Sequence, residues 1–255
     1  MKKDIQTAID RKKNQADKYM LAEGAEIKSR LAGEEFCVTR KIDGHWQCLC
    51  YQDGQAFMFD AHGKQNTQSL RCLDLLASYI GKAGVKSAVL AAELYLPRPN
   101  GCPRSGDVPG ALADPEQKDQ LALAIFDIIE LDGEYYQSMP YKQVHDKLTE
   151  LLRVKSVSEH KGRKLTIYKS HSACKPVEMK LAKSVDEVIA IYHYWIEKQG
   201  AEGLVVHSDN GLITIIQPLY PIEVVEEIFE CRSSLLDWPV KNGAAIIPED
   251  TSEIQ

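Results

Sequence analysis

The chain has 255 residues, 44% of them hydrophobic, and a mean hydropathy of −0.31. A chain of this length buries a large core in one domain or slightly more, and its apolar runs are too short for a membrane-spanning helix. The net charge of −6 and the pI near 5.7 argue against unassisted binding to nucleic acid, because such binding depends mostly on neutralising phosphates.

Cysteine use and the N-terminus point to the same compartment. The seven cysteines include no Cys-x-x-Cys pair, and most of them lie in apolar runs, which is typical of reduced core thiols. The first residues, Met1 to Asp4, lead into a charged segment and not into an apolar signal peptide. We therefore expect a cytoplasmic protein that contacts no membrane.

The chain begins with a predicted helical segment over residues 1–31, in which Ile5, Ala8 and Ile9 form an apolar stripe. Residues 34–60 are predicted to form a meander of strands.

Within this meander, Thr39-Arg40-Lys41-Ile42-Asp43-Gly44 ends a strand with a lysine followed by Asp-Gly. Lys41 is the candidate nucleophile, because this is how a nucleotidyl-accepting amine is commonly presented. Only the unprotonated amine attacks, and the neighbouring cation Arg40 favours that form. Asp43-Gly44 is also typical of a hairpin turn that needs no chemistry, and this alternative stays open at the level of sequence.

A helix is predicted over residues 67–83 and a strand over 86–97, where Glu93 interrupts an apolar run. A buried carboxylate is costly unless a polar group meets it, so Glu93 is expected to face a pocket. The Pro/Gly-rich stretch from Pro97 to Asp107 is predicted to be a loop near the mouth of that pocket.

Two later strand-like runs carry further candidates. The nearly continuous apolar run 121–129 contains Phe126-Asp127, and the run 201–207 begins with Glu202-Gly203 and is predicted to turn at Asn210-Gly211 into a last strand over 212–218.

Two helices are predicted between these runs. Met139-Pro140-Tyr141 opens the first, and Ser184 with Glu187 forms a capping box for a second that Gly200 closes.

In this order the segments resemble the covalent nucleotidyltransferases, which include ATP-dependent DNA ligases, RNA ligases and mRNA capping enzymes. The resemblance covers roughly residues 30–222 and implies that Lys41 is the nucleophile in a motif closed by Gly44. It further implies that Thr39 meets the adenine amino group, that Glu93 binds the ribose, that Phe126 stacks on the base and that Glu202 holds Mg²⁺.

Four positions depart from the pattern of that family. Trp46 stands where the family has an arginine after the lysine motif, and Ala61 replaces a second arginine. Ile215 and Gln217 occupy the two positions where lysines would grip the α-phosphate. The loss of these two charge-assisted contacts weakens the stabilisation of the transition state by about 2 kcal/mol or more for each contact, unless Arg40, Lys180 or Lys183 substitutes.

The charge is unevenly distributed toward the C-terminus. Residues 153–183 hold nine Lys or Arg against two acids, whereas eight acids follow Ile222 against two bases. The basic segment is interpreted equally well as a solvated surface and as a patch for a nucleic-acid backbone. Pro221 to Cys231 is predicted to be helical, and the 37 residues after Pro218 are too few for the oligonucleotide-binding barrel that follows in ligases.

We therefore expect an α+β fold of two antiparallel sheets flanked by helices, without a complete oligonucleotide-binding fold. The expected parts are an N-terminal helical segment (1–31), a nucleotidyltransferase domain (32–222) and an acidic tail (223–255). The expected function is ATP- and Mg²⁺-dependent adenylation that passes AMP from Lys41 to a 5′-phosphate end in nicked duplex DNA or RNA, with a partner protein supplying the closing module. The alternative is an impaired module that binds nucleotides or nucleic-acid ends for a partner.

Overall fold

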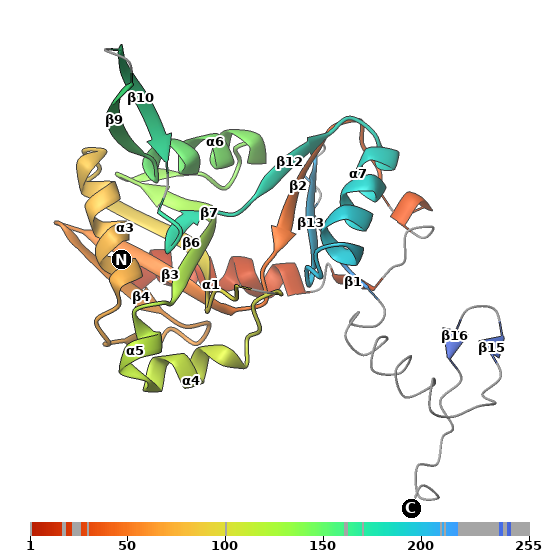
Figure 1. Cartoon of the computed structure of the whole chain (residues 1–255), viewed down its shortest axis with the longest axis horizontal. Helices are drawn as coiled ribbons and strands as arrows, with labels where there is room; N and C mark the ends of the chain where they lie inside the picture. The colour runs from red at the N-terminus through yellow and green to blue at the C-terminus, as the bar shows by residue number, and fades with distance from the viewer. Residues whose placement is uncertain are drawn as a thin grey trace, which may run out of the picture. The chain divides into compact units, whose positions relative to one another are not determined.

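The computed structural model describes residues 2–16, 19–21, 27–29, 31–99, 101–160, 163–169, 171–209, 211, 213–218, 240–241 and 244–245. The chain divides into two compact units, Met1–Leu219 and Tyr220–Gln255. In the second unit, the described residues form the short antiparallel pair β15 (Val240–Lys241) and β16 (Ala244–Ala245). The two larger sheets and the described helices belong to the first unit (Figure 1).

Two mainly antiparallel sheets form the first unit, which confirms the predicted fold class. The small sheet has the order β1 (Tyr19–Leu21), β14 (Ile213–Gln217), β13 (Gly203–Ser208), β2 (Phe36–Lys41), β12 (Met179–Ala182). The large sheet has the order β11 (Cys174–Pro176), β7 (Ala122–Leu131), β6 (Ser87–Tyr95), β3 (His45–Gln52), β4 (Gln55–Phe59), β5 (Gln65–Asn66), with β8 (Glu134–Tyr135) beside β7. The edge strands β1 and β11 are added in parallel.

The helices are α1 (Lys2–Ala16), α3 (Arg71–Lys82), α4 (Asp107–Ala113), α5 (Pro115–Lys118), α6 (Tyr141–Leu151) and α7 (Val185–Tyr192), which continues as the π-helix η1 (His193–Glu197). The predicted capping box is confirmed, because the Ser184 hydroxyl accepts a hydrogen bond from the Glu187 amide at 3.2 Å. Gly200 follows η1 with a φ of +63°, which suits a glycine that ends a helix. Pro140 caps α6, as the sequence predicts.

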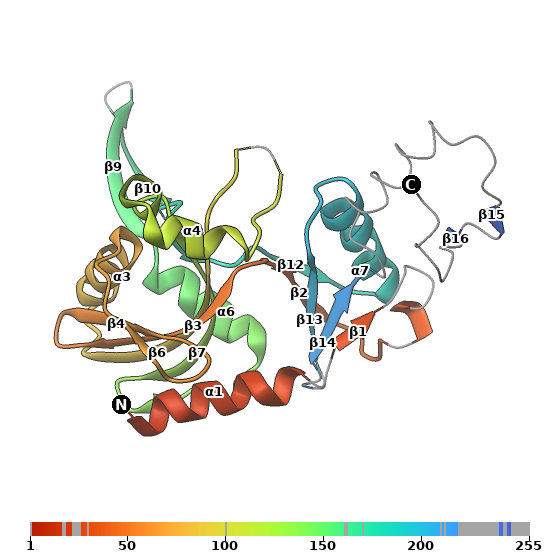
Figure 2. The same ribbon diagram turned by 90° about the horizontal axis from the view of Figure 1, so that it is seen from below.

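The two faces of the large sheet bury different sets of side chains. Leu49 and Leu90 point into a cluster of thirty buried residues that includes parts of α3, α4 and α6. Cys48 and Val89 point to the other side, into a cluster of nine that includes the apolar stripe of α1. Figure 2 shows α1 running along this second face beneath β3, β6 and β7. The alternation of strand side chains therefore assigns each residue of β3 to one helical layer.

The connection between β2 and β3 is not a hairpin. β2 pairs with β13 and β12 in the small sheet, whereas β3 pairs with β4 and β6 in the large one. The alternative in which Asp43-Gly44 forms a hairpin turn is therefore wrong. The three residues 42–44 carry the chain from one sheet to the other, and Lys41 ends its strand at this crossing.

The structure corrects the helical prediction for the N-terminal segment. Residues 2–16 and 27–29 are helical, but Tyr19–Leu21 forms the edge strand β1, because β14 of the small sheet offers it a partner. Asn210 of the predicted turn and the helix predicted at 221–231 lie outside the described residues. The hairpin of β9 (Val154–His160) and β10 (Arg163–Lys169) carries part of the basic segment.

The six cysteines in the described part of the chain are free, and four of them are buried, in agreement with core thiols. Across the same residues, no helix is long and apolar enough to cross a membrane.

Candidate active site

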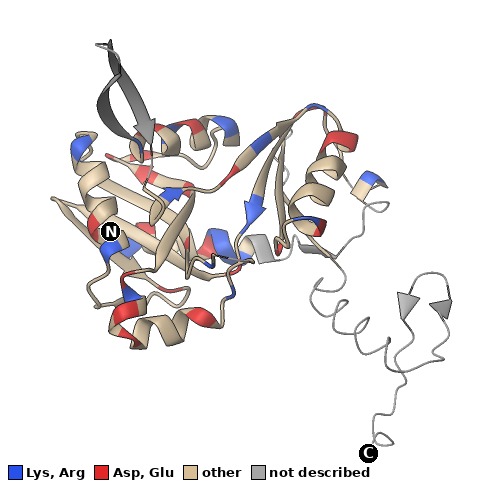
Figure 3. Ribbon diagram, in the orientation of Figure 1, with Lys and Arg blue, Asp and Glu red and all other residues tan. Residues whose placement is uncertain are grey.

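Strand pairing in the small sheet brings together four of the candidate site residues named from the sequence. Val205 lies opposite both Thr39 and Ile215, so these three side chains share one face of the sheet. Lys41 follows Thr39 by two residues, and Gln217 follows Ile215 by two, so both lie on that same face at the end of their strands. The basic residues that end β2 form the blue arrowhead of this strand in Figure 3.

Lys41, Glu202 and Gln217 form a connected polar group. The Lys41 ammonium forms an ion pair with Oε1 of Glu202, and the Gln217 amide donates a hydrogen bond of 2.8 Å to the same oxygen. Glu202 Oε2 is buried and has no hydrogen-bond partner among the described residues. Gln217 lies where the family resemblance implies a phosphate contact, but here it binds the Glu202 carboxylate. The second oxygen of that carboxylate stays available to a ligand.

Glu93 reaches this group from the large sheet. It lies opposite Trp46 in the β3–β6 pairing, on the face that α1 covers. The residue is half-buried, but its Oε2 atom is fully buried and accepts no hydrogen bond within the described part of the chain. Burial raises the pKa of Glu93 to about 8, the nearby Lys41 opposes this rise and Glu202 adds to it. Glu93 is thus a protonatable group beside the candidate nucleophile.

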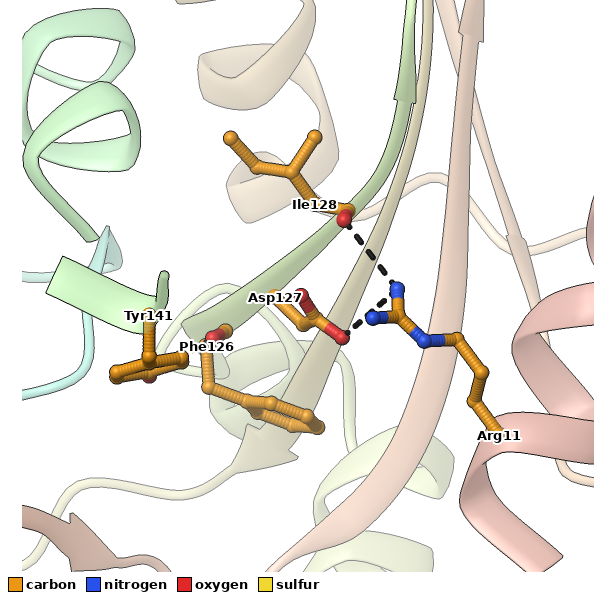
Figure 4. Close-up of polar contacts among 5 residues, drawn as sticks. All are labelled: Arg11, Phe126, Asp127, Ile128 and Tyr141. Atoms are coloured by element: carbon orange, nitrogen blue, oxygen red, sulfur yellow. Dashed lines mark hydrogen bonds and ion pairs between the residues drawn. The ribbon is translucent and has the colours of Figure 1, made fainter. Parts of the chain in front are cut away.

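Phe126 and Asp127 both project from the α1 side of the large sheet because β7 is irregular at this point. Asp127 pairs with Ala91 and Ile125 pairs with Ala92, so Phe126 is an extra residue that forms a β-bulge. Its ring packs against the cluster of nine beside α1. The hydroxyl of Tyr141 donates a hydrogen bond of 2.9 Å to the Phe126 carbonyl, which fixes the bulge from the other side (Figure 4).

Arg11 of α1 anchors the same bulge. Its guanidinium lies 3.2 Å from Oδ2 of Asp127 and donates a longer hydrogen bond of 3.4 Å to the Ile128 carbonyl (Figure 4). Burial raises the pKa of Asp127 to about 6, and the charge of Arg11 opposes that rise. Helix α1 is therefore part of the support for Phe126, for which the family resemblance implies stacking on a base.

The three cations considered as substitutes for the missing lysines lie elsewhere. Arg40 points away from the Lys41 face, and its guanidinium donates to the side chains of Cys102 and Gln199 at 3.2 Å. Lys180 lies opposite Val38 on the helix-covered face, with its ammonium 4.3 Å from the ring centre of Tyr194.

Lys183 lies just after β12 at the far end of the small sheet, about 20 Å from Lys41 at roughly 3.3 Å per residue. Strand alternation and distance therefore separate all three cations from Lys41, and none of them takes the place of the missing lysines at this site.

Two glycines are required by close backbone approach. A Cβ on Gly44 would lie 2.6 Å from the Leu94 carbonyl oxygen, so only glycine fits where the chain crosses between the sheets. A Cβ on Gly203 would collide with the Ile216 carbonyl oxygen.

Thr39 is buried, and its hydroxyl donates a hydrogen bond to the Val205 carbonyl at 3.2 Å.

Sequence reasoning missed the stacked pair of Tyr141 and His207. Their ring centres lie 3.5 Å apart at an angle of 3°, and His207 shares its sheet face with Thr39. The alternation of β13 would have placed His207 there, but a histidine without metal-ligand spacing gave no chemical signal. The pair lines a cavity of about 1050 Å³ near Cys37, toward the end of β2 remote from Lys41.

The residues fit a magnesium ion that uses few protein ligands. Among the described residues, no group of three or more His, Cys, Asp or Glu is arranged to hold a metal. Glu202 nevertheless offers a buried carboxylate oxygen without a partner. Mg²⁺ is commonly bound by one or two carboxylates together with substrate phosphates, which matches this arrangement.

Comparison with known proteins bears on the family and the fold of the chain. The family model described as "ATP dependent DNA ligase domain" matches residues 19–214. The solved ligase domain of LigD from M. tuberculosis is similar with a TM-score of 0.53 at 14% identity, covering 78% of this chain and 57% of that one. A mycobacterial DNA ligase D complexed with ATP and MES gives the same TM-score of 0.53 at 14% identity and covers 78% and 59%. A search of curated proteins finds no match.

At this identity the two solved structures establish likeness of fold, and the chain spans less than two thirds of each of them.

Proposed function

Because the chain belongs to the family of ATP-dependent DNA ligase domains, we propose that it adenylates itself at Lys41 and passes AMP to a 5′-phosphate end of a polynucleotide. The observation that carries this proposal is that three side chains meet where the chain crosses between the sheets. Lys41 ends β2, Glu202 lies at the start of β13, and Glu93 comes from β6. Nicked duplex DNA or RNA is the proposed acceptor, and a partner protein is proposed to close the site.

In the proposed reaction the unprotonated amine of Lys41 attacks the α-phosphorus of ATP. A phosphorus–nitrogen bond forms, the bond to the bridging oxygen breaks, and pyrophosphate leaves with that electron pair. Lys41 loses its proton before the attack, so its ion pair with Glu202 has to open. Mg²⁺ would supply neutralisation of the developing phosphate charge, and Glu202 would hold it.

Glu93 and Phe126 serve the nucleotide in this proposal. The protonatable carboxyl of Glu93 would bind the ribose hydroxyls, and the ring of Phe126 would stack on the base. Phe126 is held in place by the bulge of β7, by Tyr141 and by the Arg11–Asp127 ion pair. Pre-positioned groups of this kind lower the cost of ordering a ligand on binding.

The test is the mass of the intact protein after incubation with ATP and Mg²⁺. We expect a gain of one AMP moiety, its loss on addition of pyrophosphate, and no gain in Lys41→Ala. Lys28→Ala is the matched control, because Lys28 forms an exposed ion pair with Asp186 on the surface. A protein freed of bound AMP that gains no adduct from any nucleoside triphosphate would overturn the proposed transfer.

A second function is favoured by one observation. Gln217 and Lys41 share one oxygen of Glu202, and neither Ile215 nor Gln217 carries the positive charge that the transfer of a phosphoryl group uses. A module in which Lys41 and Gln217 both stay bound to Glu202 would bind nucleotides or nucleic-acid ends without transferring AMP.

The double variant Ile215→Lys, Gln217→Lys separates the two functions. A folded double variant that forms the adduct faster than the parent supports a slow enzyme. A double variant that binds ATP and still forms no adduct supports the binding module.

A further inference from the structure

Helix α1 brings a cation to the site from outside the motifs. Its apolar stripe of Ile5, Ala8 and Ile9 faces the large sheet, and the same stripe continues after one turn to Lys12. Lys12 is half-buried, whereas the next residue, Lys13, is exposed. The helix therefore directs the ammonium of Lys12 toward the sheet while that of Lys13 lies in solvent.

The partner of Lys12 on the sheet is Trp46. The Lys12 ammonium lies 5.5 Å from the centre of the indole ring, within the range of a cation–π interaction. Trp46 lies directly opposite Glu93, which belongs to the candidate site. Burial raises the pKa of Glu93 to about 8, and the charge of Lys12 is among those that oppose the rise. Lys12, Trp46 and Glu93 thus form one group on the α1 face.

Lys12 and the neighbouring Arg11 differ in how the described residues pair their charges. Within the described part of the chain, no aspartate or glutamate forms an ion pair with Lys12. The neighbouring Arg11, by contrast, is engaged by Asp127 and by the Ile128 carbonyl. A half-buried cation that has a ring as its described partner and forms no ion pair keeps its capacity to bind an anion.

We propose that Lys12 binds a phosphate group of the nucleotide, so that α1 supplies a positive charge that β3 lacks at Trp46. This inference rests on the proposed function, because it assumes that the Lys41 site takes a nucleotide. Trp46 orients the Lys12 ammonium beside Glu93, and the negative charge of the phosphate balances the positive charge of that ammonium. Lys12 is a binding residue for the ligand in this arrangement, and Arg11 is a positioning residue for Phe126.

The experiment measures binding of ATP and of adenosine by isothermal titration calorimetry to the full chain and its variants. Lys12→Gln is expected to lower the affinity for ATP about tenfold, which is the effect of losing one charge-assisted contact. The affinity for adenosine is expected to stay unchanged, because adenosine carries no phosphate. Lys12→Arg keeps the charge and is expected to retain most of the affinity for ATP. Lys13→Gln removes the same charge from the exposed side of the helix and is the matched control.

The outcomes separate this inference from the proposed function. If the parent binds ATP and Lys12→Gln binds it equally well, the inference fails and the proposed function stands. An equal loss of ATP and adenosine affinity would give Lys12 a purely structural role through Trp46 and would also overturn the inference. If the parent binds no ATP, the proposed function fails and takes the inference with it.

Discussion

One face of the large sheet belongs to a cluster of thirty buried residues that includes parts of α3, α4 and α6. The opposite face belongs to a cluster of nine that includes the apolar stripe of α1, and it then gives way to Trp46, Glu93 and Asp127. The first face is mainly apolar, with Gln47 as a buried polar residue. The second face carries buried carboxylates, one of them with an oxygen that accepts no hydrogen bond among the described residues. The difference teaches that stability and ligand binding are divided between two sides of the same strands.

The first prediction compares two consecutive residues of β7. Ile128 and Ile129 are both buried, but Ile128 belongs to the cluster of thirty and Ile129 to the cluster of nine. Replacing a buried isoleucine by alanine costs about 2–5 kcal/mol, and the cost is smaller where the surroundings can collapse into the cavity. We expect Ile128→Ala to lower the free energy of unfolding more than Ile129→Ala, because one helix can move more readily than a full layer.

Denaturation in urea at pH 7 measures both variants. Equal losses would show that α1 is as firmly packed as the opposite layer, and the division between the faces would then rest on the polar groups alone.

The second prediction concerns Glu93. The pKa of this carboxyl is raised by burial to about 8, so the folded protein holds a proton that the unfolded chain releases above its ordinary pKa of 4.5. The resulting stabilisation is complete below about pH 4.5 and is lost as the pH rises through 8. Glu93→Gln removes the ionisable group and is expected to raise the free energy of unfolding by about 1–3 kcal/mol at pH 8.5, with little change at pH 4.5.

Urea denaturation at pH 4.5, 7 and 8.5 tests this sign, and Glu134→Gln, an exposed carboxylate of β8, is the control. An identical pH dependence in the parent and in Glu93→Gln would contradict the raised pKa. The same variant is expected to bind nucleotide more weakly, so that stability and binding change in opposite directions.

The third prediction has the smallest expected effect and concerns the ion pair that links α1 to β7. Arg11→Gln leaves Asp127 without its opposing charge, so the pKa of Asp127 is expected to rise above about 6. Because a raised pKa destabilises the folded protein only where the carboxyl ionises, the loss is expected to be small below pH 5 and about 1–2 kcal/mol at pH 8.

Lys13→Gln removes a charge from the exposed side of the same helix and serves as the control. A loss of stability in Arg11→Gln that is the same at pH 4.5 and pH 8 would mean that Arg11 acts through packing and not through Asp127.

The sequence predicts those parts of the fold that depend on local patterns. Alternation predicts β2, β3 and β6, the capping box predicts the start of α7 at Ser184, and the order of the motifs predicts that Lys41, Glu93 and Glu202 meet. Each of these follows from residues close in sequence or from a resemblance that already contains the long-range contacts.

The remaining features depend on partners distant in the chain. The strand β1 has three residues and exists because β14 pairs with it across almost 200 positions, so no local signal marks it. The direction of Lys180 away from the site follows from its pairing with Val38, which the sequence does not specify. Contact of Lys12 with Trp46 likewise requires the helix to be placed on the sheet.

The bulged strand β7 has a consequence for how this site can be gained or lost in evolution. Phe126 and Ile129 are both extra residues relative to β6, and the residues on either side of them are paired in continuous order. Deleting the two together would leave a regular strand with Ile125, Asp127, Ile128 and Glu130 in their present pairs. Deleting either one alone also keeps these pairs, because it removes one bulge and leaves the other unchanged. A descendant gene can therefore discard the aromatic ring through a single codon deletion and still encode the same sheet.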